Sequence, residues 1–90
     1  MSALAFPLTL YVRIGCHLCE DMREQIAELL EPGSFTLTTV DIDEEPALVQ
    51  RYNALVPVLE HDSQEICHHF LDLEALWRVK AGYNKRIGRK

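Results

Sequence analysis

Hydrophobic and polar residues alternate along the first part of the chain and then change to a helical spacing. From Pro7 to Ile14, apolar side chains occupy every second position, which is typical of a strand. Gly15 ends this pattern. From His17 to the turn signal Pro32-Gly33, apolar residues then recur at helical spacing: Cys19, Met22, Ile26, Leu29 and Leu30. The sequence therefore predicts a strand followed directly by a helix.

The middle of the chain predicts a second strand and helix, and then a hairpin. Residues 35–42 are rich in Thr, Val and aromatic side chains, which favours a strand. Asp43 is expected to cap a helix that runs to about Asn53. Two short antiparallel strands, 57–60 and 65–68, are predicted to flank a polar turn.

The last predicted helix follows Asp72, whose side chain can cap it, and ends at Gly82. Its expected apolar side, with an amphipathic end, is formed by Leu73, Leu76, Trp77 and Lys80. The complete order is β-α-β-α-β-β-α, an α/β fold with a four-stranded mixed sheet flanked by helices. Because such a strand–helix–strand crossover is right-handed, the first two strands are expected to be parallel.

Length and composition fit one small domain over residues 1–90, with a core at about 7–80 and a basic tail at 80–90. The basic tail is interpreted as a solvated, frayed terminus, so no nucleic-acid partner is expected. The first residues lack the pattern of a signal peptide, and no stretch approaches the ~20 apolar residues of a membrane span. We therefore expect a soluble, cytoplasmic and monomeric protein.

Cys16 and Cys19 form a Cys-x-x-Cys pair at the junction of the predicted strand and helix. The N-terminus of a helix favours an anion, so Cys16 is the predicted nucleophile, with a thiol pKa lowered by about one unit at most. His17, if protonated, and Arg13 would help the thiolate, whereas the acidic residues one turn later oppose it. Cys19 is positioned to attack the mixed disulfide at Cys16 and release the reduced partner. The pair predicts thiol-disulfide exchange in a reducing compartment.

Two sequence features carry a family resemblance: Gly15-Cys16-His17-Leu18-Cys19-Glu20 after the first strand, and Val56-Pro57-Val58 before the hairpin. With these features and its order of elements, the chain resembles the glutaredoxin and thioredoxin superfamily over about residues 7–80. The chain looks most similar to small glutaredoxin-like proteins of largely unassigned function that have a Cys-His-Leu-Cys site. The resemblance implies a thioredoxin-like fold, catalytic Cys16 and Cys19, and a cis Pro57. It also implies that the Val56 backbone pairs with a bound thiol peptide. The expected substrate-binding residues are Val56, Pro57, His17 and Arg13.

The sequence departs from the superfamily pattern in two places. His17 stands where a proline usually follows the first cysteine, so the redox potential is not readable by analogy. Where glutaredoxins receive the γ-glutamyl end of glutathione on a Gly-Gly and acidic segment, this chain has Cys67-His68-His69-Phe70-Leu71-Asp72. No cofactor is therefore expected, and the expected partner is a disulfide-containing protein or a glutathione-type thiol.

Two other classes of function stay open at this stage. A metal or iron–sulfur carrier would use thiolate and imidazole ligands from Cys16, Cys19, Cys67, His68 and His69. A noncatalytic module would keep the fold and hold a peptide without exchange. No metal site is assigned, because the predicted topology separates Cys67 from Cys16 by two strand spacings of about 4.8 Å each. Cys67 is instead expected to pack beneath the last helix, beside Leu71 and Trp77, and to be dispensable for exchange.

Overall fold

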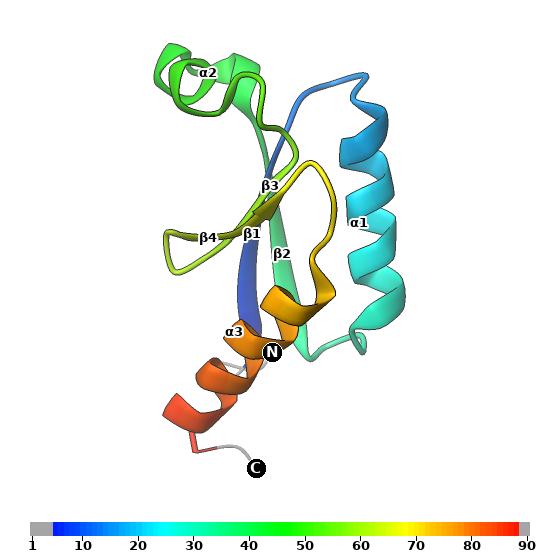
Figure 1. The fold of residues 1–90 in the computed structure, drawn as a ribbon, viewed down its shortest axis with the longest axis vertical. Coiled ribbons are helices and arrows are strands. Elements are labelled where there is room, and N and C mark those ends of the chain that lie inside the picture. Colours follow the sequence, from blue (N-terminus) through cyan, green and yellow to red (C-terminus); the bar gives the residue numbers. More distant parts are fainter. Residues whose placement is uncertain (1–4, 89–90) are drawn as a thin grey trace.

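The computed structural model describes residues 5–88, and its helices and strands follow the predicted order β-α-β-α-β-β-α with one added 3-10 helix (Figure 1). The elements are β1 (Phe6–Val12), α1 (His17–Leu29), β2 (Phe35–Asp41), the 3-10 helix η1 (Ile42–Glu44), α2 (Pro46–Tyr52), β3 (Val58–His61), β4 (Gln64–His68) and α3 (Leu73–Arg86). None of the helices within these described residues is long and apolar enough to cross a membrane.

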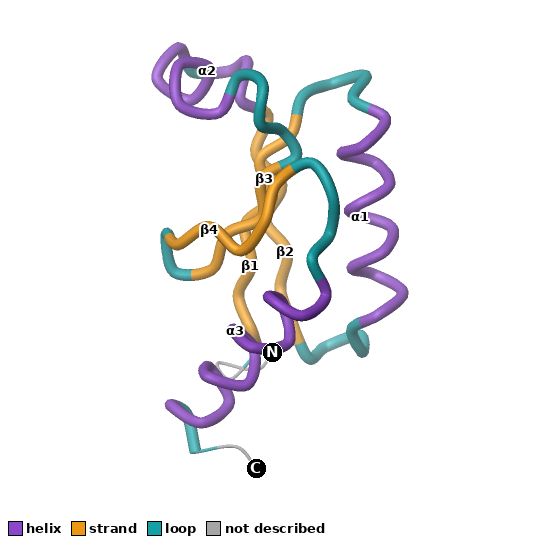
Figure 2. Tube along the Cα trace, in the orientation of Figure 1, coloured by secondary structure: helices purple, strands orange, loops and turns teal. Residues whose placement is uncertain are grey.

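The strands form one mixed sheet in the order β2-β1-β3-β4 (Figure 2). β1 runs parallel to β2, as predicted from the crossover rule, and antiparallel to β3 with Leu10 opposite Leu59. β3 and β4 form a hairpin through Asp62 and Ser63, whose φ angles of 55° and 66° suit a two-residue turn. The sheet therefore places β1, with the Cys-x-x-Cys motif at its end, in a central position.

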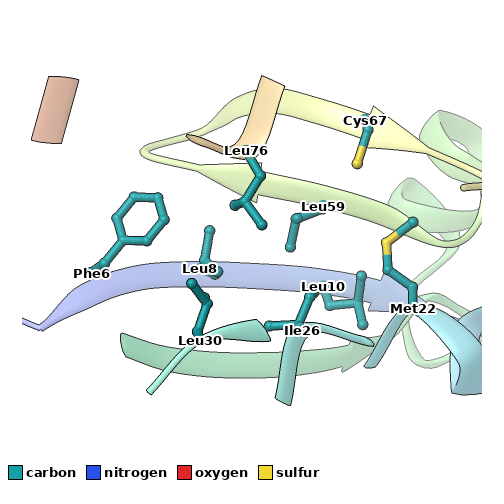
Figure 3. Close-up of a cluster of buried hydrophobic side chains, with 9 residues drawn as sticks. All are labelled: Phe6, Leu8, Leu10, Met22, Ile26, Leu30, Leu59, Cys67 and Leu76. Atoms are coloured by element: carbon teal, nitrogen blue, oxygen red, sulfur yellow. The ribbon is translucent and has the colours of Figure 1, made fainter. Parts of the chain in front are cut away.

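The period-two alternation in the central strands builds one apolar cluster on each face of the sheet. On one face, Leu8 and Leu10 of β1 pack with side chains of α1 and α3 (Figure 3). The fully buried members of this cluster include Met22 and Ile26 of α1. On the other face, a smaller cluster consists of Ile42, Tyr52 and Val58. Helices thus cover both faces, and α1 is anchored along its length below the motif.

A buried hydrogen bond holds the end of α2 on the second face of the sheet. The Tyr52 hydroxyl donates to Glu60 Oε2 at 2.6 Å, and the Tyr52 ring stacks on Tyr11 with 4.3 Å between ring centroids. Burial of the hydroxyl, followed by its bond to Glu60, raises the pKa of Tyr52 above its ordinary value. This contact fixes the point from which the chain continues toward Val56 and Pro57.

Two predicted features near the motif are wrong. β1 ends at Val12 instead of Ile14, whose side chain is 84% exposed. Asp43 does not cap α2. The N-cap is Glu45, and the Asp43 carboxylate instead accepts hydrogen bonds from the Arg13 guanidinium. Asp43 therefore pairs with Arg13, 30 positions away in the sequence, instead of capping the helix that follows it.

The last helix is longer than predicted. Gly82 lies inside α3, which continues to Arg86 and is followed by Gly88 at a φ of +78°. The Tyr83 hydroxyl donates to the backbone carbonyl of Ala5 at 3.0 Å, and this tertiary contact lies one residue beyond the glycine expected to end the helix. The expected basic tail is therefore helical as far as Arg86, and its residues 89–90 lie outside the described residues.

The apolar side of α3 also differs from the prediction. Leu76 is fully buried, and Val79 and Tyr83 pack against the same cluster. Leu73 and Trp77 are 43% and 42% exposed. The stripe that contacts the sheet therefore runs through positions i, i+3 and i+7 from Leu76, because the added turn carries Tyr83 to the sheet.

Candidate functional site

The two cysteines of the motif lie where β1 passes into α1 and are joined by a disulfide, with Cα atoms 5.2 Å apart. Gly15, at a φ of +82°, turns the chain between the two elements. Cys16 is the N-cap of α1, and its Sγ accepts the backbone N–H of Cys19 at an N···S distance of 3.1 Å. The N-terminus of a helix stabilises a negative charge. A thiolate at Cys16 would therefore be stabilised by its position at the start of α1.

The two sulfurs differ in their access to solvent. Cys16 is partly exposed, whereas Cys19 lies one turn inward and is only 3% exposed. A molecule in solution can therefore reach Cys16 before Cys19. The assignment of Cys16 as the attacking sulfur and Cys19 as the resolving sulfur stays a prediction.

Arg13 precedes the motif and His17 lies within it, and the two side chains have different surroundings. The Arg13 guanidinium donates three hydrogen bonds to the Asp43 carboxylate: Nε to Oδ2 and Nη2 to Oδ1 at 3.0 Å each, and Nε to Oδ1 at 3.2 Å. The backbone carbonyl of Arg13 also accepts the N–H of Cys16 at 3.1 Å. His17 is exposed at the first residue of α1. Because Asp43 offsets the charge of Arg13, the guanidinium ties the motif loop to η1 more than it favours a thiolate.

The loop before β3 carries Val56 and Pro57, and the peptide bond between them is cis. His69, which follows β4, holds this loop at two points. Its backbone N–H donates to the Pro57 carbonyl at 2.9 Å, and its Nε2 lies 2.7 Å from the Ala54 carbonyl oxygen. Since a carbonyl oxygen only accepts, Nε2 must carry the hydrogen in this bond. The segment after β4 thus fixes the segment before β3.

His69 has a left-handed backbone, with a φ of +66°, which costs an L-residue about 1–2 kcal/mol relative to a right-handed one. In the sequence analysis, this residue was considered as a candidate metal ligand. Its bond to Ala54 spans 15 residues, so no local pattern reveals it. The neighbouring His68 is the last residue of β4, and its Nδ1 lies 2.6 Å from Glu65 Oε2.

The third cysteine belongs to the core and not to the motif. Cys67 is 8% exposed, has a free thiol and packs in the cluster with Leu59 and Leu76, while Leu71 lies against that cluster (Figure 3). The expected contact with Trp77 is wrong: Trp77 is 42% exposed, lies outside the cluster and lines a surface hollow with Leu29 and Leu30. Burial raises the pKa of the Cys67 thiol. Across residues 5–88, no three His, Cys, Asp or Glu side chains come together in a way that could hold a metal ion.

The strand order, the helices on both faces and the Cys-x-x-Cys motif at the start of α1 define a thioredoxin-fold protein of the glutaredoxin-like kind. Two solved structures below 25% identity show the fold. A mutant thioredoxin from Halobacterium salinarum is 24% identical over 86% of this chain and 73% of that chain, with a TM-score of 0.54. Glutaredoxin C1 from Populus tremula × tremuloides is 12% identical over 92% of this chain and 81% of that chain, with a TM-score of 0.53.

Residues 7–79 match the family described as "Glutaredoxin-like domain (DUF836)", and the chain belongs to this family. A Nitrosomonas europaea protein with a solution NMR structure is 34% identical over 88% of this chain and 95% of its own, with a TM-score of 0.77. An X. campestris protein with an X-ray structure is 31% identical over 83% of this chain and 96% of its own, with a TM-score of 0.66. The curated proteins contain no match to the chain.

Proposed function

We propose that the protein is a thiol-disulfide oxidoreductase that uses Cys16 and Cys19 as a redox-active dithiol. The observation that carries this proposal is the position of Cys16: it caps α1, its sulfur accepts a backbone N–H, and it shares a disulfide with the more buried Cys19. A metal carrier would use the same cysteines, but Cys67 is held in the core and no further ligand group lies with them among residues 5–88.

The reaction begins from the reduced protein. The Cys16 thiolate attacks one sulfur of the partner disulfide, forms a mixed disulfide and releases the other partner sulfur as a thiolate. Cys19 then loses its proton to solvent and attacks the Cys16 sulfur. The bond between Cys16 and the partner breaks, and the second partner thiolate leaves. Two electrons pass from the dithiol to the partner, whose two thiolates take up protons from solvent, and a thiol reductant restores the dithiol.

The neighbouring segments supply the proposed binding residues. The Val56 backbone and Pro57 would pair with an extended segment of the partner, while His17 lies exposed beside Cys16. Arg13 would act by positioning, since its pair with Asp43 holds the loop that presents Cys16. A disulfide-containing protein or a glutathione-type thiol is the proposed partner. We place the reaction in the cytoplasm, where the sparse cysteine usage of the chain fits a reducing environment.

The proposal is tested by steady-state reduction of hydroxyethyl disulfide and of insulin, with dithiothreitol as the reductant. Cys16→Ser should abolish the catalysed rate, because it removes the attacking sulfur. Cys67→Ala is the matched control: it also removes one thiol, but one buried away from the motif, and it should keep the wild-type rate. If both disulfides are reduced no faster with the wild-type protein than with dithiothreitol alone, the protein is a binding module and not an oxidoreductase.

A further inference from the structure

A hollow of about 150 Å³ lies between α1 and the segment that joins β4 to α3, which run beside each other in Figure 1. Its walls are formed by residues 69–71 of the joining segment and, on α1, by Leu18, Asp21, Met22 and Gln25. Leu18 stands between Cys16 and Cys19 in the motif, so the motif itself supplies one residue of the wall. His69, which lines the hollow, also bonds to Ala54 and Pro57, so one residue links the hollow to the loop that is proposed to bind a peptide.

The hollow combines one carboxylate, one exposed aromatic ring and an apolar floor. Phe70 is 69% exposed, although large apolar side chains are more often buried. Asp21 is exposed and forms no ion pair within the described part of the chain. A carboxylate beside an aromatic face suits a Lys ammonium or an Arg guanidinium, which bonds to the first and stacks on the second.

The charge around the hollow has the same sign. α1 carries the carboxylates of Glu20, Asp21, Glu24 and Glu28, and its one basic residue, Arg23, is already paired with Glu20 at 3.0 Å. The whole chain has a formal net charge of −5. A cationic group is therefore attracted toward this face.

We propose that this hollow is a specificity subsite that receives a Lys or Arg side chain beside the reacting cysteine of a partner protein. The apolar stem of that side chain would lie on Leu18 and Leu71, with its charged end at Asp21 and Phe70. The inference rests on the proposed exchange function and names its partner class: a disulfide flanked by basic residues.

The test compares three disulfide-linked peptides that are identical except for Lys, norleucine or Glu next to the cysteine. The wild-type protein should reduce the Lys peptide with a kcat/KM about fivefold or more above that of the norleucine peptide, and the Glu peptide should be the slowest. Asp21→Asn should bring the Lys-to-norleucine ratio close to one. Phe70→Leu should lower the same ratio by a smaller factor, because it keeps the carboxylate.

Glu24→Gln is the matched control, since it removes the same charge from the same helix outside the hollow. It should keep the wild-type ratio. A wild-type ratio near one, or equal loss in Asp21→Asn and Glu24→Gln, would overturn the subsite. Turnover of hydroxyethyl disulfide, which has no charge, is measured beside the peptides. If that turnover persists without a peptide preference, the subsite fails and the exchange function stands; if it is absent, the exchange function itself fails.

Discussion

Replacing His69 with alanine and with glycine separates two opposing contributions at the segment that holds the Val56-Pro57 loop. Both substitutions remove the bond from Nε2 to the Ala54 carbonyl, and both keep the backbone N–H that donates to Pro57. Only glycine also relieves the left-handed backbone at a φ of +66°. The difference in unfolding free energy between the two variants therefore has two contributions: the backbone strain that glycine relieves, and the greater flexibility of glycine in the unfolded chain.

The structure sets the size of each contribution. The side-chain bond is 2.7 Å long and partly exposed, so its loss should cost about 0.5–1 kcal/mol in His69→Ala. Glycine should regain about 1–2 kcal/mol of left-handed strain and lose about 0.5–1 kcal/mol to unfolded-state entropy. His69→Gly is thus expected to be more stable than His69→Ala by about 0.5–1 kcal/mol.

Urea unfolding of the oxidised variants gives these free energies directly. Exchange kinetics supply a second measurement, because both variants remove one of the two bonds from His69 to the loop that is proposed to pair with a partner. Each should lose more activity toward a peptide disulfide than toward hydroxyethyl disulfide. His69→Gln, which offers an amide N–H to Ala54, is the control and should keep most of the peptide activity. If alanine proves more stable than glycine at this position, the strain assignment is wrong.

Three further substitutions test other parts of the structure. Tyr52→Phe should cost about 1–3 kcal/mol, because it leaves the buried Glu60 carboxylate without its donor. Since burial raises the pKa of Tyr52, the wild-type free energy of unfolding should fall as the pH rises above about 10, and a pH series in urea should show less of this fall in the variant. Cys67→Ala should cost roughly 1 kcal/mol in urea and leave exchange unchanged, and native Cys67 should resist iodoacetamide at pH 8. Asp43→Asn should cost only about 0.2–1 kcal/mol, less in 1 M salt, because its pair with Arg13 is partly exposed.

Local sequence was sufficient wherever one element decides its own structure. The alternation through Leu8 and Leu10 identified the central strand, and the spacing of Met22 and Ile26 identified the face of α1 that packs on it. The position of Cys16 at a strand–helix junction identified the candidate nucleophile, because helix-end chemistry is local.

Long-range contacts account for what the sequence could not predict. Asp43 was expected to cap a helix, but it binds Arg13, which lies in the loop between β1 and α1. Gly82 was expected to end α3, but the bond from Tyr83 to Ala5 joins residues 78 positions apart. The role of His69 depends on Ala54 in the same way. In each case a partner distant in sequence competes with a local preference and prevails.

The most direct test of the exchange function is mixed-disulfide trapping followed by intact mass spectrometry. Reduced Cys19→Ser and reduced Cys16→Ser are each mixed with a disulfide-linked peptide and quenched with acid. A stable peptide adduct is expected on Cys16 in Cys19→Ser, since attack proceeds but resolution cannot follow, and none is expected in Cys16→Ser. Equal amounts of adduct in both variants, or an adduct on Cys67, would contradict the two-cysteine mechanism.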